Sequence, residues 1–176
     1  LRRLPVAEKY LLDIAEFDSD WYVVAGSNAL KGVYIFRNPL DAVLAKTTDI
    51  PSPFRFLKIM NPQHVAFSAN AQFILAGRGT EHAVYDIDNE GVYHYTAPGP
   101  MDSPQDHVSW MDGHRLWYVS SGKLVVYDYD NLNRHVLQAA LPQYGVYFAP
   151  NYLHGYTLTQ QAGAAPSLEQ TAFVIP

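Results

Sequence analysis

A short segment occurs twice in this chain, and the repetition is the feature that most restricts the fold. The sequence reads AVYDIDN at residues 83–89 and VVYDYDN at residues 125–131, a spacing of 42 residues. Upstream, HVAF at residue 64 matches HVSW at residue 107, and residues 72–76 match residues 115–119, both at a spacing of 43. We expect the one-residue difference in the short turn that follows residues 72–76 and 115–119, where a change of length costs little.

Two less regular copies flank this pair. In the first copy, residues 20–26 and 33–38 match the second copy at a spacing of 51. The fourth copy begins at Tyr144 and reaches Pro176 after a polar stretch, residues 160–170, whose composition predicts a flexible loop. A repeat of this kind indicates structural units that bury their apolar faces against one another.

The third copy shows most clearly what each unit contains. Val, Tyr, Trp and Leu dominate four short segments, which predicts strands at residues 107–110, 115–120, 124–130 and 135–141. Asp-Gly and Ser-Gly stand between them, since Gly accepts a positive φ and Asp bonds its own backbone. Leu11–Glu16 and Ala42–Lys46 resemble helices, but neither has a sustained 3.6-residue period.

Four antiparallel strands that recur every 40–45 residues are typical of β-propeller blades. We therefore predict an all-β fold, a β-propeller of about four antiparallel four-stranded blades. It would be a small closed ring, or half of a larger or dimeric ring. Residues 1–176 would form one propeller domain or segment, with residues 4–12 as a possible closing strand and approximate blades at residues 13–60, 64–98, 107–141 and 144–176.

The two middle copies also carry a family resemblance. HVAFSANAQFILAG with AVYDIDN, and HVSWMDGHRLWYVSSGKLVVYDYDN, resemble the WD40-like propeller repeats of the TolB type. In that family an aromatic-Ser-Pro-Asp-Gly turn precedes one strand and a Tyr-Asp strand follows. FSANAQ lacks the Pro and Gly of that turn, and WMDGHR lacks the Ser-Pro. The resemblance implies a propeller fold and a binding role.

Pro-Gln precedes the first strand of three units, in NPQHV, SPQDHV and LPQYGV. In a propeller these connections surround one mouth of the central channel, so their polar side chains would converge there. Gln and His donate and accept hydrogen bonds, as recognition of a protein or of a small polar ligand requires. An ordinary turn role for Pro and Gln is the alternative. The candidate binding residues are Gln63, His64, Gln105, Asp106, His107, Gln143 and Tyr144.

A second polar segment, DIDNEG, resembles the start of a calcium loop. Asp86, Asp88 and Glu90 alternate before Gly91, and alternate oxygens can surround a hard cation. The twelfth position is Ala97 where a calcium loop has Glu, and the parallel DYDNLNR keeps only two carboxylates. We therefore predict a turn here and no metal cofactor, with Asp86, Asp88 and Glu90 as the calcium alternative.

Composition restricts the partners. Apolar residues make up 48% of the chain and charged residues 16%, which indicates a globular protein. The net charge is −5 with scattered Lys and Arg, so nucleic acid is not an expected partner. No apolar run approaches the ~20 residues of a transmembrane helix. The chain begins at Leu1 and not at Met, so it reads as part of a longer protein. It has no cysteine, which decides nothing about the compartment. By analogy with the propeller family that it resembles, we place it outside the cytoplasm, in the periplasm or at a cell surface.

The sequence thus predicts a non-catalytic binding or scaffold module of a bacterial, extracytoplasmic type, with its partner or ligand at the channel mouth. No cofactor is expected, and a homodimer or missing blades would complete the ring. Two alternatives stay open. One is a propeller-fold enzyme, a metal-assisted hydrolase or lyase with its site at the same mouth, and the other is a structural spacer.

Overall fold

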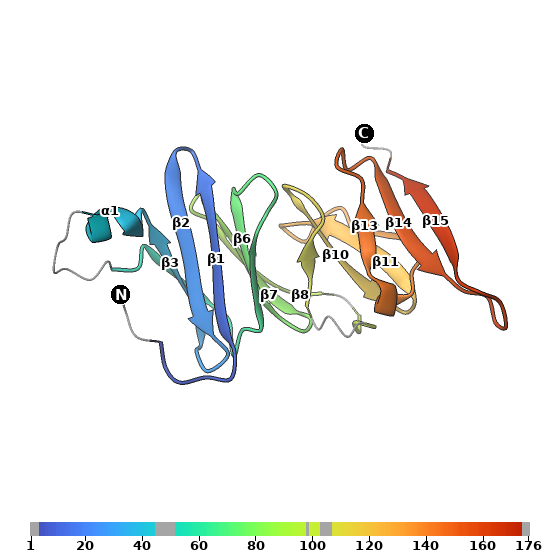
Figure 1. The fold of residues 1–176 in the computed structure, drawn as a ribbon, viewed down its shortest axis with the longest axis horizontal. Helices are drawn as coiled ribbons and strands as arrows, with labels where there is room; N and C mark the ends of the chain where they lie inside the picture. The colour runs from blue at the N-terminus through green and yellow to red at the C-terminus, as the bar shows by residue number, and fades with distance from the viewer. Residues whose placement is uncertain (1–3, 45–51, 98, 103–106, 174–176) are drawn as a thin grey trace.

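The computed structural model describes residues 4–44, 52–97, 99–102 and 107–173. They form four antiparallel sheets, each meandering in sequence order. We call the sheets blades one to four. Within a blade the strands are a to d, except that blade four has three strands, a to c, and not the predicted four among the described residues. The blades follow one another in an open row along the long axis of the molecule (Figure 1).

The strands of the four blades have the following bounds. Blade one contains β1 (Tyr10–Phe17), β2 (Asp20–Ser27), β3 (Gly32–Arg37) and β4 (Arg55–Lys58). Blade two contains β5 (His64–Phe67), β6 (Phe73–Arg78), β7 (Glu81–Asp86) and β8 (Val92–Thr96). Blade three contains β9 (Ser109–Trp110), β10 (Arg115–Ser120), β11 (Lys123–Asp128) and β12 (His135–Ala139). Blade four contains β13 (Val146–Phe148), β14 (His154–Thr159) and β15 (Ser167–Ala172).

Helical structure is confined to two short segments of the described chain, α1 (Pro39–Leu44) and the 3₁₀ turn η1 (Pro142–Tyr144). The second helix-like segment of the sequence, residues 42–46, overlaps the end of α1. The first, Leu11–Glu16, lies inside β1, where tertiary pairing decides the backbone conformation. No helix in the described ranges is long and apolar enough to cross a membrane.

The core lies between the blades. Its buried residues form three clusters, and each cluster joins two consecutive sheets. Blade two is packed on both sides, which explains why strand β6 reads FILA without alternation: Ile74 faces blade one, Leu75 faces blade three, and both are fully buried. Burying a face in this way removes apolar surface from water, the main favourable term in folding.

Polar groups also cross the interfaces between blades. The Trp110 indole N–H donates to the Ala66 carbonyl oxygen at 3.0 Å. His82 is buried, and its Nδ1 lies 3.2 Å from the Thr80 carbonyl oxygen, which can only accept. Nδ1 therefore carries the proton, and Nε2 accepts the hydroxyl of the buried Tyr127 at 3.2 Å. Blades two and three are thus joined by a hydrogen bond inside the apolar core.

The pairing register corrects one detail of the repeat alignment. Phe73 pairs with Asp86 in blade two, and Arg115 pairs with Asp128 in blade three, so the second strands are 42 residues apart and not 43. The extra residue of blade two lies in the turn after Phe67, not in the turn after β6. A shift of one residue moves every side chain of a strand to the opposite face. Trp117 accordingly matches Leu75 and faces the next blade, against Phe148.

The N-terminal segment differs from its predicted role. Tyr10–Phe17 forms strand a of blade one and pairs with β2 over eight residues, so residues 10–12 do not close the last blade. Residues 4–9 precede β1 without a strand. Strand β15 pairs with β14 alone among the described residues, and it starts at Ser167, inside the stretch predicted as a loop. The small closed ring is not formed.

The two-sided packing predicts a sharp contrast between leucines. Leu116 is fully buried between blades two and three, so Leu116→Ala should cost about 2–5 kcal/mol of unfolding free energy. Leu132 is 61% exposed in the turn after β11, and Leu132→Ala should cost less than about 0.5 kcal/mol. Urea titrations of both variants would measure the difference. Equal losses would contradict the assignment of the core.

Candidate functional site

The described parts of the predicted Pro-Gln connections lie at one end of the blades, together with the turns between strands b and c. We call this the turn end. Backbone hydrogen bonds tie the described parts of the connections to the b–c turns or to the ends of the strands beside those turns. The Gln63 N–H donates to the Gly77 carbonyl oxygen at 2.8 Å, the Ala97 N–H to that of Thr80 at 2.8 Å, and the Ala140 N–H to that of Gly122 at 2.9 Å. The Leu141 N–H continues the pattern, donating to the Leu158 carbonyl oxygen at 2.8 Å.

Two of the predicted residues meet at the turn end. His64 begins β5, and His107 lies just before β9 and bridges to Gly79 in the b–c turn of blade two. The two imidazole rings are stacked, with centroids 3.9 Å apart and planes at 20°. Each repeat contributes the His of its His-Val pair, so the stack follows from superposing one blade on the next.

The stack has an electrostatic consequence. Burial lowers the pKa of His64 to about 4, and the nearby His107 and Lys9 add to this shift because each would repel a second positive charge. His64 is therefore neutral at pH 7. It can accept or donate a hydrogen bond there, but it carries no charge to a partner.

The remaining predicted residues are distributed along the turn end. Gln143 and Tyr144 lie in η1 at the boundary of blades three and four, and both are exposed, Tyr144 by 46%. The Gln63 side chain is half-buried. Gln105 and Asp106 lie outside the described residues. Blade three separates η1 from the histidine stack, so the predicted residues form a surface and not one compact cluster.

The calcium candidate is organised as a turn. Asp86 is fully buried, and its Oδ1 accepts the backbone N–H groups of Asp88 and Asn89 at 3.1 and 3.2 Å. Its Oδ2 accepts the Asn89 side-chain amide at 2.9 Å. Glu90 pairs with Arg55 of blade one. The described residues contain no group of three His, Cys, Asp or Glu placed to hold a metal ion.

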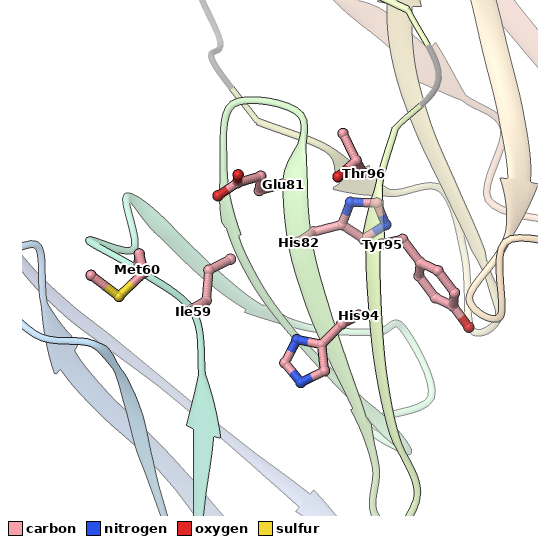
Figure 2. Close-up of a pocket in the computed structure, with 7 residues that line it drawn as sticks. All are labelled: Ile59, Met60, Glu81, His82, His94, Tyr95 and Thr96. Carbon is pink, nitrogen blue, oxygen red and sulfur yellow. The ribbon is translucent and has the colours of Figure 1, made fainter.

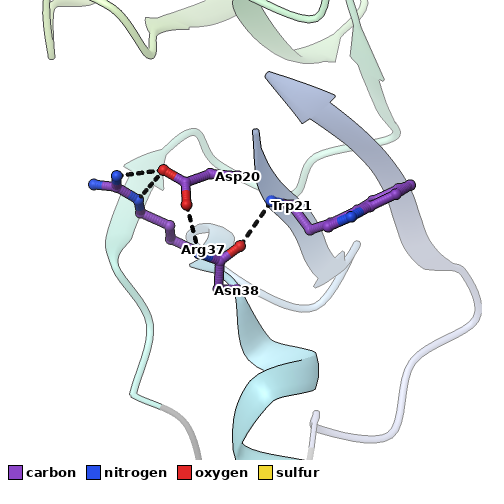
Figure 3. Close-up of polar contacts among 4 residues, drawn as sticks. All are labelled: Asp20, Trp21, Arg37 and Asn38. Atoms are coloured by element: carbon purple, nitrogen blue, oxygen red, sulfur yellow. Dashed lines mark hydrogen bonds and ion pairs between the residues drawn. The ribbon is translucent and has the colours of Figure 1, made fainter. Parts of the chain in front are cut away.

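An equivalent polar network holds blade one at the end opposite the turn end. Figure 3 shows Asp20 accepting from the guanidinium of Arg37 and from the side-chain amide of Asn38, whose oxygen in turn accepts the Trp21 N–H at 2.8 Å. The hydrogen bond from Arg37 is the main cause that lowers the pKa of Asp20, and the bond from Asn38 adds to it. Asp20 fastens the start of strand b to the turn after strand c, whereas Asp86 lies at the end of strand c and holds the turn that follows it, so both have a structural role.

Sequence reasoning missed one pocket near the turn end. It measures about 280 Å³ and lies where Ile59 and Met60 of blade one meet β7 and β8 of blade two. Figure 2 shows Glu81 and His94 pointing toward Ile59 and Met60, while His82 and Tyr95 point to the other side of the sheet. Alternation along β7 and β8 would have placed Glu81 and His94 on one face. Their apposition to blade one needed the three-dimensional structure.

Comparisons with known proteins support the fold class. No protein-family model matches the chain, and a search of curated proteins finds no match. Among solved structures, the N-terminal domain of Nup159 is similar with a TM-score of 0.54 and 15% identity, over 98% of this chain and 46% of that one. A S. cerevisiae complex of a Dbp5 variant bound to Nup159 gives a TM-score of 0.53 and 14% identity, over 99% and 46%. The tricorn protease gives 0.50 and 12%, over 81% and 14%.

These similarities concern the fold alone, because the identities are low. The Nup159 neighbours are of the WD40 or β-propeller type, so the predicted all-β propeller class is confirmed. The chain spans about half the length of these two neighbours. The four blades therefore correspond to part of a propeller that a neighbour builds from one longer chain.

The pKa of His64 predicts an acid-sensitive stability. In the unfolded chain His64 has a pKa near 6.5, so between that pH and about pH 4 the unfolded state binds a proton that the folded state does not bind. Stability should therefore fall as pH drops from about 6.5 toward 4, by up to about 3 kcal/mol from this group. His64→Gln should flatten the fall, measured by urea titration at several pH values. His135→Gln, at an exposed residue of β12, is the control, and an equal effect of both variants would contradict the assignment.

The turn at Asp86 predicts indifference to calcium. Because the carboxylate already accepts hydrogen bonds from its own turn, millimolar calcium should leave the melting temperature unchanged. Thermal melting with and without calcium measures this. A rise of several degrees that Asp88→Ala abolishes would show that the segment is a calcium site and would favour the enzyme alternative.

Proposed function

We propose that this chain is a non-catalytic binding module that recognises a protein partner through its turn end. The observation that carries the proposal is the layer formed by the described parts of the connections, which backbone hydrogen bonds fasten to the b–c turns and to the strand ends beside them. Such a layer holds loop side chains on a rigid scaffold, where binding residues are commonly found. Gln143 and Tyr144 are exposed on it, and tyrosine contributes large contact areas to protein interfaces.

The chemistry of this end supports binding over acid–base catalysis. The polar side chains of Gln63, Gln143 and Tyr144 can exchange hydrogen bonds to water for hydrogen bonds to a partner. An acid–base catalyst works best with a pKa near the working pH. His64 titrates near pH 4, well below that range.

A structural neighbour adds support of a general kind. In a solved complex, a Dbp5 variant is bound to Nup159, so a chain with a similar fold engages a protein. For the present chain a protein partner is our inference, and a small polar ligand is the alternative occupant of the same surface. The TolB-type resemblance and an extracytoplasmic bacterial location stay predictions from the sequence.

Site-specific photo-crosslinking tests the proposal. A photoreactive phenylalanine analogue at position 144 lies on the turn end, and the same analogue at position 132 lies in the exposed turn at the opposite end of blade three. In the native host extract we expect a discrete crosslinked protein from position 144 and none from position 132. Equal crosslinking from both positions, or crosslinks only between copies of this chain, would contradict the proposal.

A matched variant connects the crosslink to the predicted residues. Gln63→Ala with Gln143→Ala should weaken the crosslink from position 144 and leave the melting temperature unchanged, because both side chains lie at least partly in water. A lowered melting temperature with an unchanged crosslink would assign these glutamines to the ordinary turn role instead.

A further inference from the structure

Both ends of the row of blades carry bare apolar faces. At the N-terminal end, strand alternation and register place Leu12, Ile14, Trp21, Val23, Tyr34 and Phe56 on the outer face of blade one, which we call the head face. Leu12 is 73% exposed and Ile14 is 49% exposed. At the C-terminal end, the tail face of blade four consists of Tyr147, Tyr156, Leu158 and Leu168, with Tyr147 and Leu168 each 69% exposed.

The head face has the same pairing pattern as an interface that is buried elsewhere in the chain. Leu12 pairs with Ala25 and Ile14 with Val23, as Val65 pairs with Ala76 and Phe67 with Ile74 one blade later. In blade two this pattern is packed against blade one. Ile74 is fully buried there and Val65 is 9% exposed. The head face therefore corresponds to the face of blade two that packs against the blade before it.

The tail face shows the complementary pattern. Tyr156 pairs with Gln170 and Leu158 with Leu168, as Trp117 pairs with Val126 and Val119 with Leu124 one blade earlier. In blade three this pattern is packed against blade four, and Leu124 is fully buried. The tail face thus corresponds to the face of blade three that packs against the blade after it. A head face and a tail face would meet as consecutive blades do.

Bare faces of this kind need a cover. A repeat protein stays soluble when its terminal repeats have polar outer faces, and contiguous exposed apolar residues on a sheet mark an interaction surface. In this chain the head and tail faces share the aromatic and aliphatic composition of the internal interfaces. The same register also places Glu16 and Lys58 on the head face, so the partner that these faces fit is a mainly apolar face with the shape of a blade.

We propose that the head face of one chain packs on the tail face of a second copy, and that two copies close reciprocally into a ring of eight blades. The contact is heterologous, and such contacts form a ring when the rotation closes. One chain matches 46% of the Nup159 chain, so two copies supply about the length of that single-chain propeller. The proposal is independent of the binding partner at the turn end, because the surfaces lie on different sides of the blades.

Mass measurement by light scattering during gel filtration tests the proposal. The purified 176-residue chain should have twice the 19.8 kDa of one copy. Leu12→Asp places a charge in the head face and Leu168→Asp places one in the tail face. Each variant should elute as a monomer. Its melting temperature should equal that of the unmodified chain at a concentration where that chain is also monomeric, because both leucines are mostly exposed in the single chain. Leu132→Asp, equally exposed but on neither face, should stay dimeric.

A mixing experiment then tests the polarity of the contact. The Leu12→Asp chain keeps an intact tail face and the Leu168→Asp chain keeps an intact head face, so mixing the two should restore a dimer with one contact. A monomeric unmodified chain would overturn the proposal, and further blades in the same polypeptide would then be the cover. A dimer that Leu168→Asp leaves intact would indicate a head-to-head contact, and growth into longer polymers would exclude the closed pair. Either result would also overturn it.

Discussion

The fold depends on one constraint: a blade has two apolar faces and can bury them only against other blades. All three buried clusters join consecutive sheets. Blades two and three are covered on both sides, and most residues of their b and c strands are buried. The Tyr127–His82 hydrogen bond inside the second cluster fixes how blade three lies against blade two, because a buried polar group left without a partner would destabilise the fold.

The same constraint separates two kinds of surface. At the turn end, the connections are fastened by backbone hydrogen bonds and present polar and aromatic side chains, which suits a transient binding partner. At the head and tail faces, the exposed side chains occupy positions that the interior repeats bury wholly or partly between blades. The first kind of surface suits recognition, and the second kind suits assembly.

Much of this could be predicted from the sequence because the repeat brings its own alignment. The strands expected in the third copy overlap β9 to β12, and the fold class is confirmed. The position of the extra residue could not be predicted, since FILA and LWYV are apolar throughout and give no alternation that fixes the register. Strand β1 was missed because YLLDIAEF has two adjacent leucines, and only its pairing with β2 shows which of them is buried.

The candidate site divides in the same way. The stacking of His64 on His107 follows from the repeated His-Val pair once the blades are superposed. The position of Gln143 and Tyr144 at another blade boundary could not be predicted in this way. The prediction assumed a closed channel mouth on which all connections converge. The pocket beside Glu81 depends on how blade one sits against blade two, which no local pattern contains.

Amide hydrogen exchange tests the central claim most directly, because it reports how strongly each strand is held by its neighbours. The account predicts the slowest exchange in β6, β7, β10 and β11, whose side chains are buried between blades. It predicts much faster exchange in β8, β12 and β15, which lie at the outer edges of their sheets. Protection in β15 equal to that in β6, or no difference between inner and outer strands, would contradict the claim that burial between blades holds the fold.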